Sequence, residues 1–180
     1  MGWLVFKTGR GRHAVPGRFD PYSLPPIATL LQRRLVINRE PFRGMIPADR
    51  LYDCAHDMWV LPEDDGTVLI GATAYGIHLA GKIIGFTCKP KGAQVECHRG
   101  MATIECAKTV IAVHAPIGFD LLEGNEAAEE NPGLLNHDPY GSGWMVRVQP
   151  HDWLHDMGAL VDARRYRRQV HRADPQAEFI

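Results

Sequence analysis

The 180-residue chain lacks the features that mark membrane, secreted or catalytic proteins. No apolar run approaches the roughly 18 to 20 residues that a transmembrane helix needs, and the apolar stretch 3–6 is too short for a signal peptide. We therefore expect a cytoplasmic protein with no membrane partner. No Ser/His/Asp order, phosphate-binding glycine loop or paired-carboxylate site stands out, so we predict a non-catalytic protein.

Cysteine is scarce, and its spacing excludes the common cysteine sites. No Cys-x-x-Cys pair indicates a zinc site or a thioredoxin-like redox centre. In a reducing cytosol we expect free thiols. His151 and His155 have a spacing that two metal ligands on one helix face would have, but no third ligand is indicated, so we predict no metal. The four cysteines are Cys54, Cys88, Cys97 and Cys106.

The net charge of −1 conceals an uneven distribution. Residues 1–50 contain nine Lys/Arg and three Asp/Glu, a balance of +6, whereas the remainder contains eleven and eighteen, a balance of −7. This basic arm has no recognised nucleic-acid motif and no interleaved base-stacking aromatics, so we expect no nucleic-acid partner. Self-association as a homodimer, or packing on the acidic body, explains the arm better.

Glycine and proline divide the chain into an arm, a body and a tail. Turns break residues 1–50 into loop pieces around one short helix at 27–36, where apolar residues fall near helical spacing. Residues 51–170 alternate short β-rich runs with turns, which predicts one mainly β domain. Residues 171–180 are expected to form a frayed tail. Strands are predicted at 58–61, 67–71, 83–88, 93–97, 102–106, 110–114, 119–123 and 143–148.

Two helices are predicted within the β domain. The first spans 72–80, with Thr73 as its cap and Gly81 at its end. The second begins at Asp152, carries an apolar stripe from Leu154 to Val161, and ends in the arginine-rich run 164–168.

Lys108 lies between two β-rich runs, 102–106 and 110–114. This pattern predicts a hairpin with a charged tip rather than a helix that would bury the amine on one face. A lysine at such a tip is exposed to other proteins and could carry a covalent group. A plain solvated turn lysine is the alternative.

Several short motifs, in order along residues 51–170, resemble the glycine-cleavage H-protein family. Their order and spacing, with Lys108 between Glu105 and Pro116, argue against a chance resemblance. The motifs are Gly71–Tyr75, Leu79–Gly81, Glu105–Lys108, Ala115–Pro116, Asn125–Ala127, Asn131–Pro132 and Asp138–Trp144.

The resemblance implies a flattened β-barrel, or barrel-sandwich hybrid, with a short inserted helix and a C-terminal helix. It also implies lipoic acid attached by an amide to the hairpin lysine, here Lys108, and so a carrier whose swinging arm visits partner enzymes. A lipoate ligase or lipoyl synthase would attach the group. Within this expected fold, Tyr140 and Trp144 should pack the barrel.

Two residues beside Lys108 are further candidates. Glu105 offers a charge that the attaching ligase or a partner could recognise. Cys106 lies two residues before Lys108, so in an extended strand both side chains would point the same way and the thiol could contact a lipoyl sulfur. A small residue filling the strand edge is the plainer interpretation of Cys106. His114 is expected to be a strand histidine with its hydrogen bonds satisfied.

Departures from the family motifs leave the pathway open. At the attachment turn, ordinary H-proteins have a sequence similar to Glu-Ser-Val-Lys, whereas this chain has Glu-Cys-Ala-Lys at 105–108. In an early strand, they have a sequence similar to Glu-His-Glu-Trp, whereas this chain has His-Asp-Met-Trp at 56–59. H-protein-like lipoate-binding proteins of sulfur oxidation, which serve a heterodisulfide-reductase-like complex, fit these departures, and we lean to that branch. The alternatives are a glycine-cleavage H-protein carrying the aminomethyl group among the glycine cleavage enzymes, and an unlipoylated adaptor that recruits partners through the basic arm.

Overall fold

The computed structural model describes residues 40–107 and 109–180. The predicted helix at 27–36, most of the basic arm and Lys108 itself therefore lie outside the described residues. None of the helices in the described part is long and apolar enough to span a bilayer.

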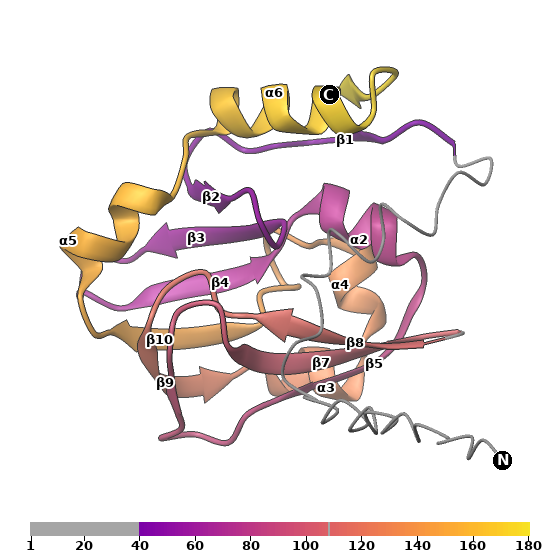
Figure 1. The fold of residues 1–180 in the computed structure, drawn as a ribbon. Coiled ribbons are helices and arrows are strands. Elements are labelled where there is room, and N and C mark those ends of the chain that lie inside the picture. The colour runs from indigo at the N-terminus through magenta and orange to yellow at the C-terminus, as the bar shows by residue number, and fades with distance from the viewer. Residues whose placement is uncertain (1–39, 108) are drawn as a thin grey trace, which may run out of the picture.

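The described strands form three sheets, which confirms the mainly β prediction (Figure 1). A six-stranded sheet has the order β2-β3-β4-β10-β9-β6, a three-stranded sheet has the order β5-β7-β8, and β1 pairs with β11. The strands are β1 (Arg43–Gly44), β2 (Leu51–Asp53), β3 (Met58–Pro62), β4 (Val68–Ala72), β5 (Ile83–Cys88), β6 (Gln94–Val95), β7 (Gly100–Cys106), β8 (Thr109–His114), β9 (Phe119–Gly124), β10 (Val146–Pro150) and β11 (Glu178–Phe179).

The main core lies between the two larger sheets. Buried residues of β7, such as Met101 and Ile104, share it with Phe119 of β9 and Val146 of β10. Buried and exposed residues alternate over 103–105 of β7, as expected for a strand with one face on the core. The two sheets therefore pack as the halves of a barrel-sandwich, and their described strands do not close into one barrel.

The helices lie around these sheets, and the inserted helix matches its prediction closely. In α2 (Ala74–Ala80) the Thr73 side chain accepts a hydrogen bond from the Gly76 amide, and Gly81 ends the helix with a φ of 85°. The other helices are α3 (Glu126–Glu130), α4 (Gly133–His137), α5 (Trp153–Asp156), the 3₁₀ turn η1 (Met157–Ala159) and α6 (Ala163–Ala173).

The single C-terminal helix predicted from Asp152 is wrong, because the structure has two helical pieces separated by an extended link. Asp152 does cap α5, but Leu160 adopts an extended backbone and Val161 bridges to Tyr52. Asp162 then caps α6. The predicted apolar stripe is not buried as a unit, since Leu154 is 82% exposed.

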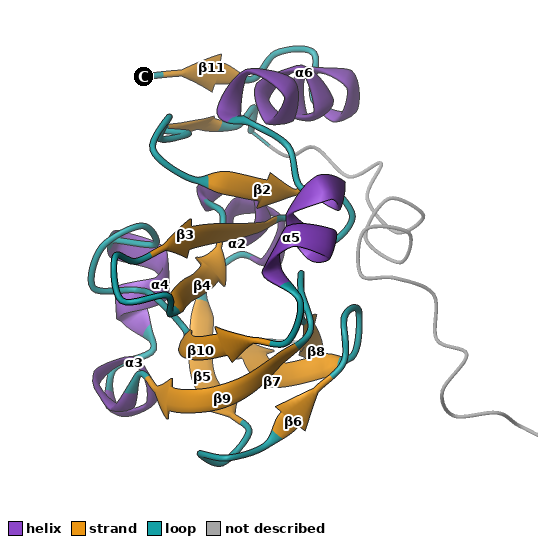
Figure 2. Cartoon of the chain, turned by 90° about the vertical axis from the view of Figure 1, so that its left-hand side faces the viewer, coloured by secondary structure: helices purple, strands orange, loops and turns teal. Residues whose placement is uncertain are grey.

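The expected frayed tail at 171–180 is also wrong, because α6 runs to Ala173 and β11 covers Glu178–Phe179. Ala177 is buried, and β11 pairs in parallel with β1 near the start of the described chain. The Phe42 amide donates a hydrogen bond of 2.7 Å to the Asp174 carboxylate. In Figure 2, α6 and β11 lie together beyond the β2 end of the six-stranded sheet. The burial gained by this non-local pairing holds the end of the chain in place.

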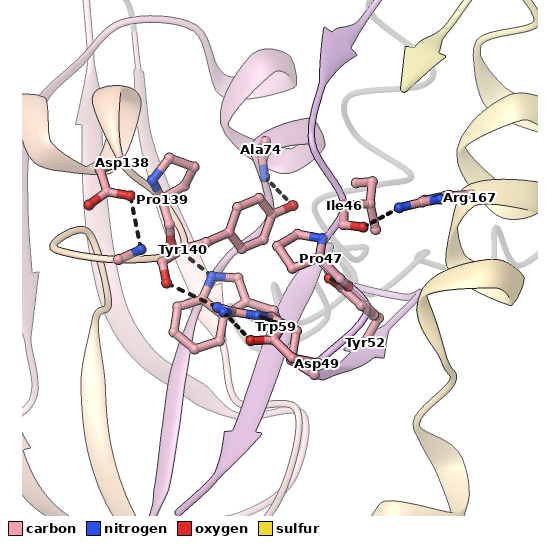
Figure 3. A network of polar contacts seen from close by, with 12 residues as sticks. Ile46, Pro47, Asp49, Tyr52, Trp59, Ala74, Asp138, Pro139, Tyr140 and Arg167 are labelled. Carbon is pink, nitrogen blue, oxygen red and sulfur yellow. Dashed lines mark hydrogen bonds and ion pairs between the residues drawn. The ribbon is translucent and has the colours of Figure 1, made fainter. Parts of the chain in front are cut away.

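A second core joins α6 and α2 to the outer strands, and Figure 3 shows the polar contacts at its edge. The Arg50 guanidinium lies 4.7 Å from the Trp59 ring centroid and donates to the Tyr140 carbonyl at 3.0 Å. The Trp59 indole N–H donates to the Pro139 carbonyl at 2.9 Å. Tyr140 and Trp144 both pack against this second core, so the predicted packing role of these aromatics is confirmed, although they serve the second core rather than the space between the larger sheets.

Candidate functional site

The hairpin predicted around Lys108 is present in the described residues. Strands β7 and β8 pair antiparallel, with Glu105 opposite Val110 and Cys106 opposite Thr109. Only residues 107 and 108 connect the last pair, so the connection has the length of the tightest common hairpin loop. Lys108 lies outside the described residues, and its neighbours Ala107 and Thr109 are both exposed.

The two faces of this hairpin differ in burial. Ile104 faces the core, whereas Thr103 and Glu105 are exposed on the other face. A Cβ placed on Gly85 of the neighbouring strand β5 would meet the Glu105 carboxyl group at 3.1 Å, so the Glu105 side chain lies across that glycine. Within residues 40–107 and 109–180 no cation forms an ion pair with Glu105. Among the described residues the Glu105 carboxylate is thus exposed and without a cationic partner.

Cys106 is half-buried at the end of β7 and packs against the main core. Burial raises the pKa of its thiol, so the thiol is protonated near neutral pH and is a weak nucleophile. This favours the plainer interpretation of Cys106 as a small packing residue. Its contact with a lipoyl sulfur stays a prediction. Burial also raises the pKa of the three other cysteines.

A small cavity of about 40 Å³ lies behind the hairpin. Its wall is formed by apolar side chains of the hairpin, such as Ile104 and Ile111, and of α2, such as Ile77, while His56 and Asp57 contribute polar groups. Burial raises the pKa of Asp57 to about 6, against the opposing effect of its hydrogen bond from Tyr166. The core-facing side of the hairpin thus adjoins a largely apolar pocket that includes the polar side chains of His56 and Asp57.

Among the histidines singled out in the sequence, only His114 departs from its prediction. His151 bonds Asp120 and His155 bonds Asp156, and the only group of metal-ligating side chains that comes together among the described residues excludes both of them. His114, expected to be satisfied, has a buried Nδ1 with no hydrogen-bond partner in the described chain. Burial, followed by the nearby His56 and His98, lowers the pKa of His114.

Sequence reasoning missed that His114 meets His56 and His98. The ring centroids of His56 and His114 are 5.0 Å apart, and those of His56 and His98 are 5.2 Å apart. These residues are widely separated in sequence, so no local spacing could indicate the cluster. The one available signal was the short Asp53-x-x-His56 pair, whose side chains lie 2.6 Å apart.

Comparisons with known proteins agree with this geometry. The family model described as "Glycine cleavage H-protein" matches residues 50–173. A glycine cleavage system H protein of Thermus thermophilus is 40% identical over 121 residues, which cover 67% of this chain and 92% of the relative. Glycine cleavage system H protein 2 of Aquifex aeolicus is 38% identical over 123 residues, covering 68% of this chain and 76% of that protein.

A solved structure gives the same result. The crystal structure of a glycine cleavage system H protein from Mycobacterium marinum superposes with a TM-score of 0.62 at 32% sequence identity, covering 69% of this chain and 98% of that one. The similarity includes the β7–β8 hairpin and α6, since the family match runs from residue 50 to residue 173. On fold, hairpin and sequence together, the chain belongs to the glycine cleavage H-protein family, whose members are non-catalytic carriers with lipoate covalently attached to a lysine.

Proposed function

We propose that this chain is the lipoyl carrier of a glycine cleavage system, with lipoate attached through an amide to Lys108. The main support for attachment at Lys108 is the pairing register of the β7–β8 hairpin. Because Cys106 pairs with Thr109, residues 107 and 108 form the whole connection between β7 and β8. A residue in a loop this short, with exposed neighbours on both sides, can be reached by a modifying enzyme.

The residues around position 108 fit an attached group. Ile104 and Val113 are buried and fix the core-facing side of the hairpin. The strands that lead to the 107–108 link are therefore held in place by the core. When bound, the dithiolane supplies a reactive pair of sulfurs that accepts a group at one enzyme and delivers it at the next. The chain supplies position, and tethering raises the local concentration of the carried group at each partner.

Glu105 is the residue that we propose for recognition by the ligase or a partner enzyme. It lies on the exposed face of the hairpin, across Gly85, and is separated from the tip by Cys106 and Ala107. An exposed carboxylate beside an attachment site can steer a basic enzyme surface into register.

The comparisons favour glycine cleavage over our leaning towards sulfur oxidation, which they do not support. The relatives and the solved structure described above are all named for the glycine cleavage system. Glycine cleavage enzymes, with a lipoate ligase or lipoyl synthase, are therefore the proposed partners. The sulfur-oxidation branch rests only on the departures at 56–59 and 105–108. The division at residue 50, the dimer through the arm, the adaptor role of the arm and the cytoplasmic location stay predictions.

The attachment site can be tested by intact mass. After coexpression with a lipoate ligase, the full chain should gain the mass of one lipoyl group, and Lys108→Arg should abolish the gain. Lys91→Arg is the matched control, because Lys91 is an exposed turn lysine elsewhere in the body. A lipoyl group retained on the Lys108→Arg protein would refute the assignment.

The pathway needs a second assay on the lipoylated protein. A reconstituted glycine cleavage system should release CO₂ from carboxyl-labelled glycine only when the lipoylated chain is added. A lipoylated chain that supports no release, alongside an active H-protein control, would reject glycine cleavage and favour the sulfur-oxidation branch.

A further inference from the structure

Three side chains from two separate loops gather on one side of the molecule. Asp53 ends β2, His56 lies in the turn that follows, and His98 lies in the loop between β6 and β7. Each offers one ligand atom, and these atoms lie within 4.8 Å of one another. Asp53 is buried, His56 is half-buried and His98 is exposed. The group is therefore closed to solvent at Asp53, which forms its floor, and open to solvent at His98.

The floor of the group is held firmly. The Asp53 carboxylate accepts a hydrogen bond from the Ala55 amide at 2.8 Å through Oδ1, while Oδ2 lies 2.6 Å from Nδ1 of His56. A carboxylate has about four acceptor sites on its two oxygens, so Asp53 can hold the His56 ring in place and still offer an oxygen to an ion. The other imidazole nitrogen of His56 is then free to act as an acceptor.

A fourth group lies against the first three. The His114 ring, at the end of β8, stacks on His56 with 29° between the ring planes. Its buried Nδ1 has no hydrogen-bond partner in the described part of the chain. An unpaired buried nitrogen is destabilising, and a ligand or an ordered water would supply the missing partner.

We propose that Asp53, His56 and His98 form a binding site for a divalent transition-metal ion of the zinc type, with His114 as a further nitrogen donor. Imidazole nitrogen with one carboxylate oxygen is a ligand set that suits Zn²⁺ and its neighbours in the first transition row. Hard cations such as Mg²⁺ and Ca²⁺ prefer oxygen ligands and are poor candidates here.

The spacing requires only a modest contraction. Tetrahedral zinc with bonds near 2.0 to 2.1 Å holds its ligand atoms roughly 3.4 Å apart. The three atoms already lie within 4.8 Å, and the exposed His98 side chain can move inward by rotation. The ordinary alternative is that Asp53 and His56 merely close a turn while the other two rings stack on it, and this alternative predicts no metal affinity.

A metal here would connect parts of the fold that are otherwise distant in sequence. Asp53 and His56 belong to the β2–β3 end of the six-stranded sheet, whereas His114 belongs to β8, the strand that forms one side of the hairpin. The ion would therefore fasten the base of the attachment hairpin to the opposite sheet. Binding to the folded state alone would raise the unfolding temperature as the metal concentration rises.

Calorimetric titration with Zn²⁺ tests the site directly. The full chain is used without a histidine tag, freed of metal by chelation, and with any lipoyl group kept as the cyclic disulfide so that it offers no thiolate. We expect one equivalent to bind and the unfolding temperature to rise. His98→Ala and Asp53→Asn should each weaken binding by at least about tenfold.

His155→Ala is the matched control, because His155 is an exposed histidine that pairs with Asp156 outside the cluster. It should leave the affinity unchanged. If Asp53→Asn does not fold, His98→Ala decides, since removing an exposed side chain should preserve the structure. Equal affinity in His98→Ala and the parent, or no binding by the parent, would overturn the proposal.

X-ray absorption of the zinc-loaded protein identifies the ligand atoms. A first shell of nitrogen and oxygen only is expected. A sulfur shell would assign the ion to a thiol and refute the site, and Cys97→Ser provides the matching control because Cys97 is the thiol next to His98 in sequence. Its Sγ contacts the Pro116 carbonyl at 3.4 Å, so Cys97→Ser should retain the full affinity.

Discussion

The phenolic hydroxyl of Tyr166 on α6 donates a 2.7 Å hydrogen bond to Oδ1 of Asp57 in the turn before β3. The hydroxyl oxygen of Tyr166 also lies 2.8 Å from Oγ1 of Thr73, the N-cap of α2. Since the Tyr166 proton is directed to the carboxylate, the Thr73 hydroxyl donates to Tyr166 while it accepts from the Gly76 amide. One buried tyrosine therefore connects the C-terminal helix to the inserted helix and to the wall of the cavity behind the hairpin.

Tyr166→Phe should lower the free energy of unfolding by about 1 to 3 kcal/mol, because it leaves the buried Asp57 carboxylate and the Thr73 hydroxyl without this partner. The stacking of residue 166 on Tyr52, at 4.7 Å between ring centroids, should survive. Urea denaturation measures the change. Arg168→Ala, an exposed position on the same helix, should stay within about 0.5 kcal/mol of the parent. Equal losses in both variants would show that the hydroxyl network contributes nothing.

Asp138→Asn should destabilise the protein by about 1 kcal/mol at neutral pH. The Asp138 carboxylate accepts from the Ser142 amide at 2.7 Å, the Ser142 hydroxyl at 2.9 Å and the Gly141 amide at 3.0 Å. These bonds, first among them that from the Ser142 amide, lower the pKa of Asp138 below its usual 3.8. Because the folded pKa is the lower one, the stabilisation is complete above about pH 4 and is lost as the pH falls through the folded pKa.

The pH dependence separates this contribution from a general loss of packing. The difference in unfolding free energy between the parent and Asp138→Asn should shrink as the pH falls below 3.8, measured by denaturation at several acid pH values. A difference that is constant across this range would contradict a role for the ionised carboxylate.

Gly71→Ala should cost about 1 to 3 kcal/mol of stability through overpacking. A Cβ at position 71 would lie 2.5 Å from Cζ2 of Trp59, whose ring is buried and held by its bond to Pro139. Thermal unfolding compares it with Gly100→Ala, where a Cβ meets no atom within 4 Å. A Gly71→Ala protein as stable as Gly100→Ala would mean that the Trp59 ring can move aside.

Glu105→Gln should slow lipoylation several-fold without changing the stability of the chain, because it removes an exposed charge from the hairpin. The rate of mass gain with a purified ligase measures it. Glu96→Gln, which removes another exposed carboxylate, should keep the parental rate. The effect should weaken at high ionic strength, where exposed charges are screened. A loss that is independent of salt would point to a contact other than charge.

Sequence patterns within a few residues predicted the strands and helix ends that depend on neighbouring residues alone. The β-rich runs that form β5, β7 and β8 are visible in the sequence because strand-favouring residues are bounded by turns. Thr73 and Gly81 mark the ends of α2 because cap geometry needs those residue types. The same reasoning failed at 152–168. Helical spacing alone could not show that Val161 would leave the helix to pair with Tyr52.

The sequence by itself determined the family, the hairpin and the position of Lys108 in the short link between two β runs, because these depend on neighbours within a few residues. Only the tertiary structure decided that β11 pairs with β1, that Tyr166 reaches Asp57, and that His56, His98 and His114 meet. These contacts join segments far apart in the chain. They form because the folded chain buries apolar surface. A local pattern of residue types does not indicate which distant side chains this burial brings into contact.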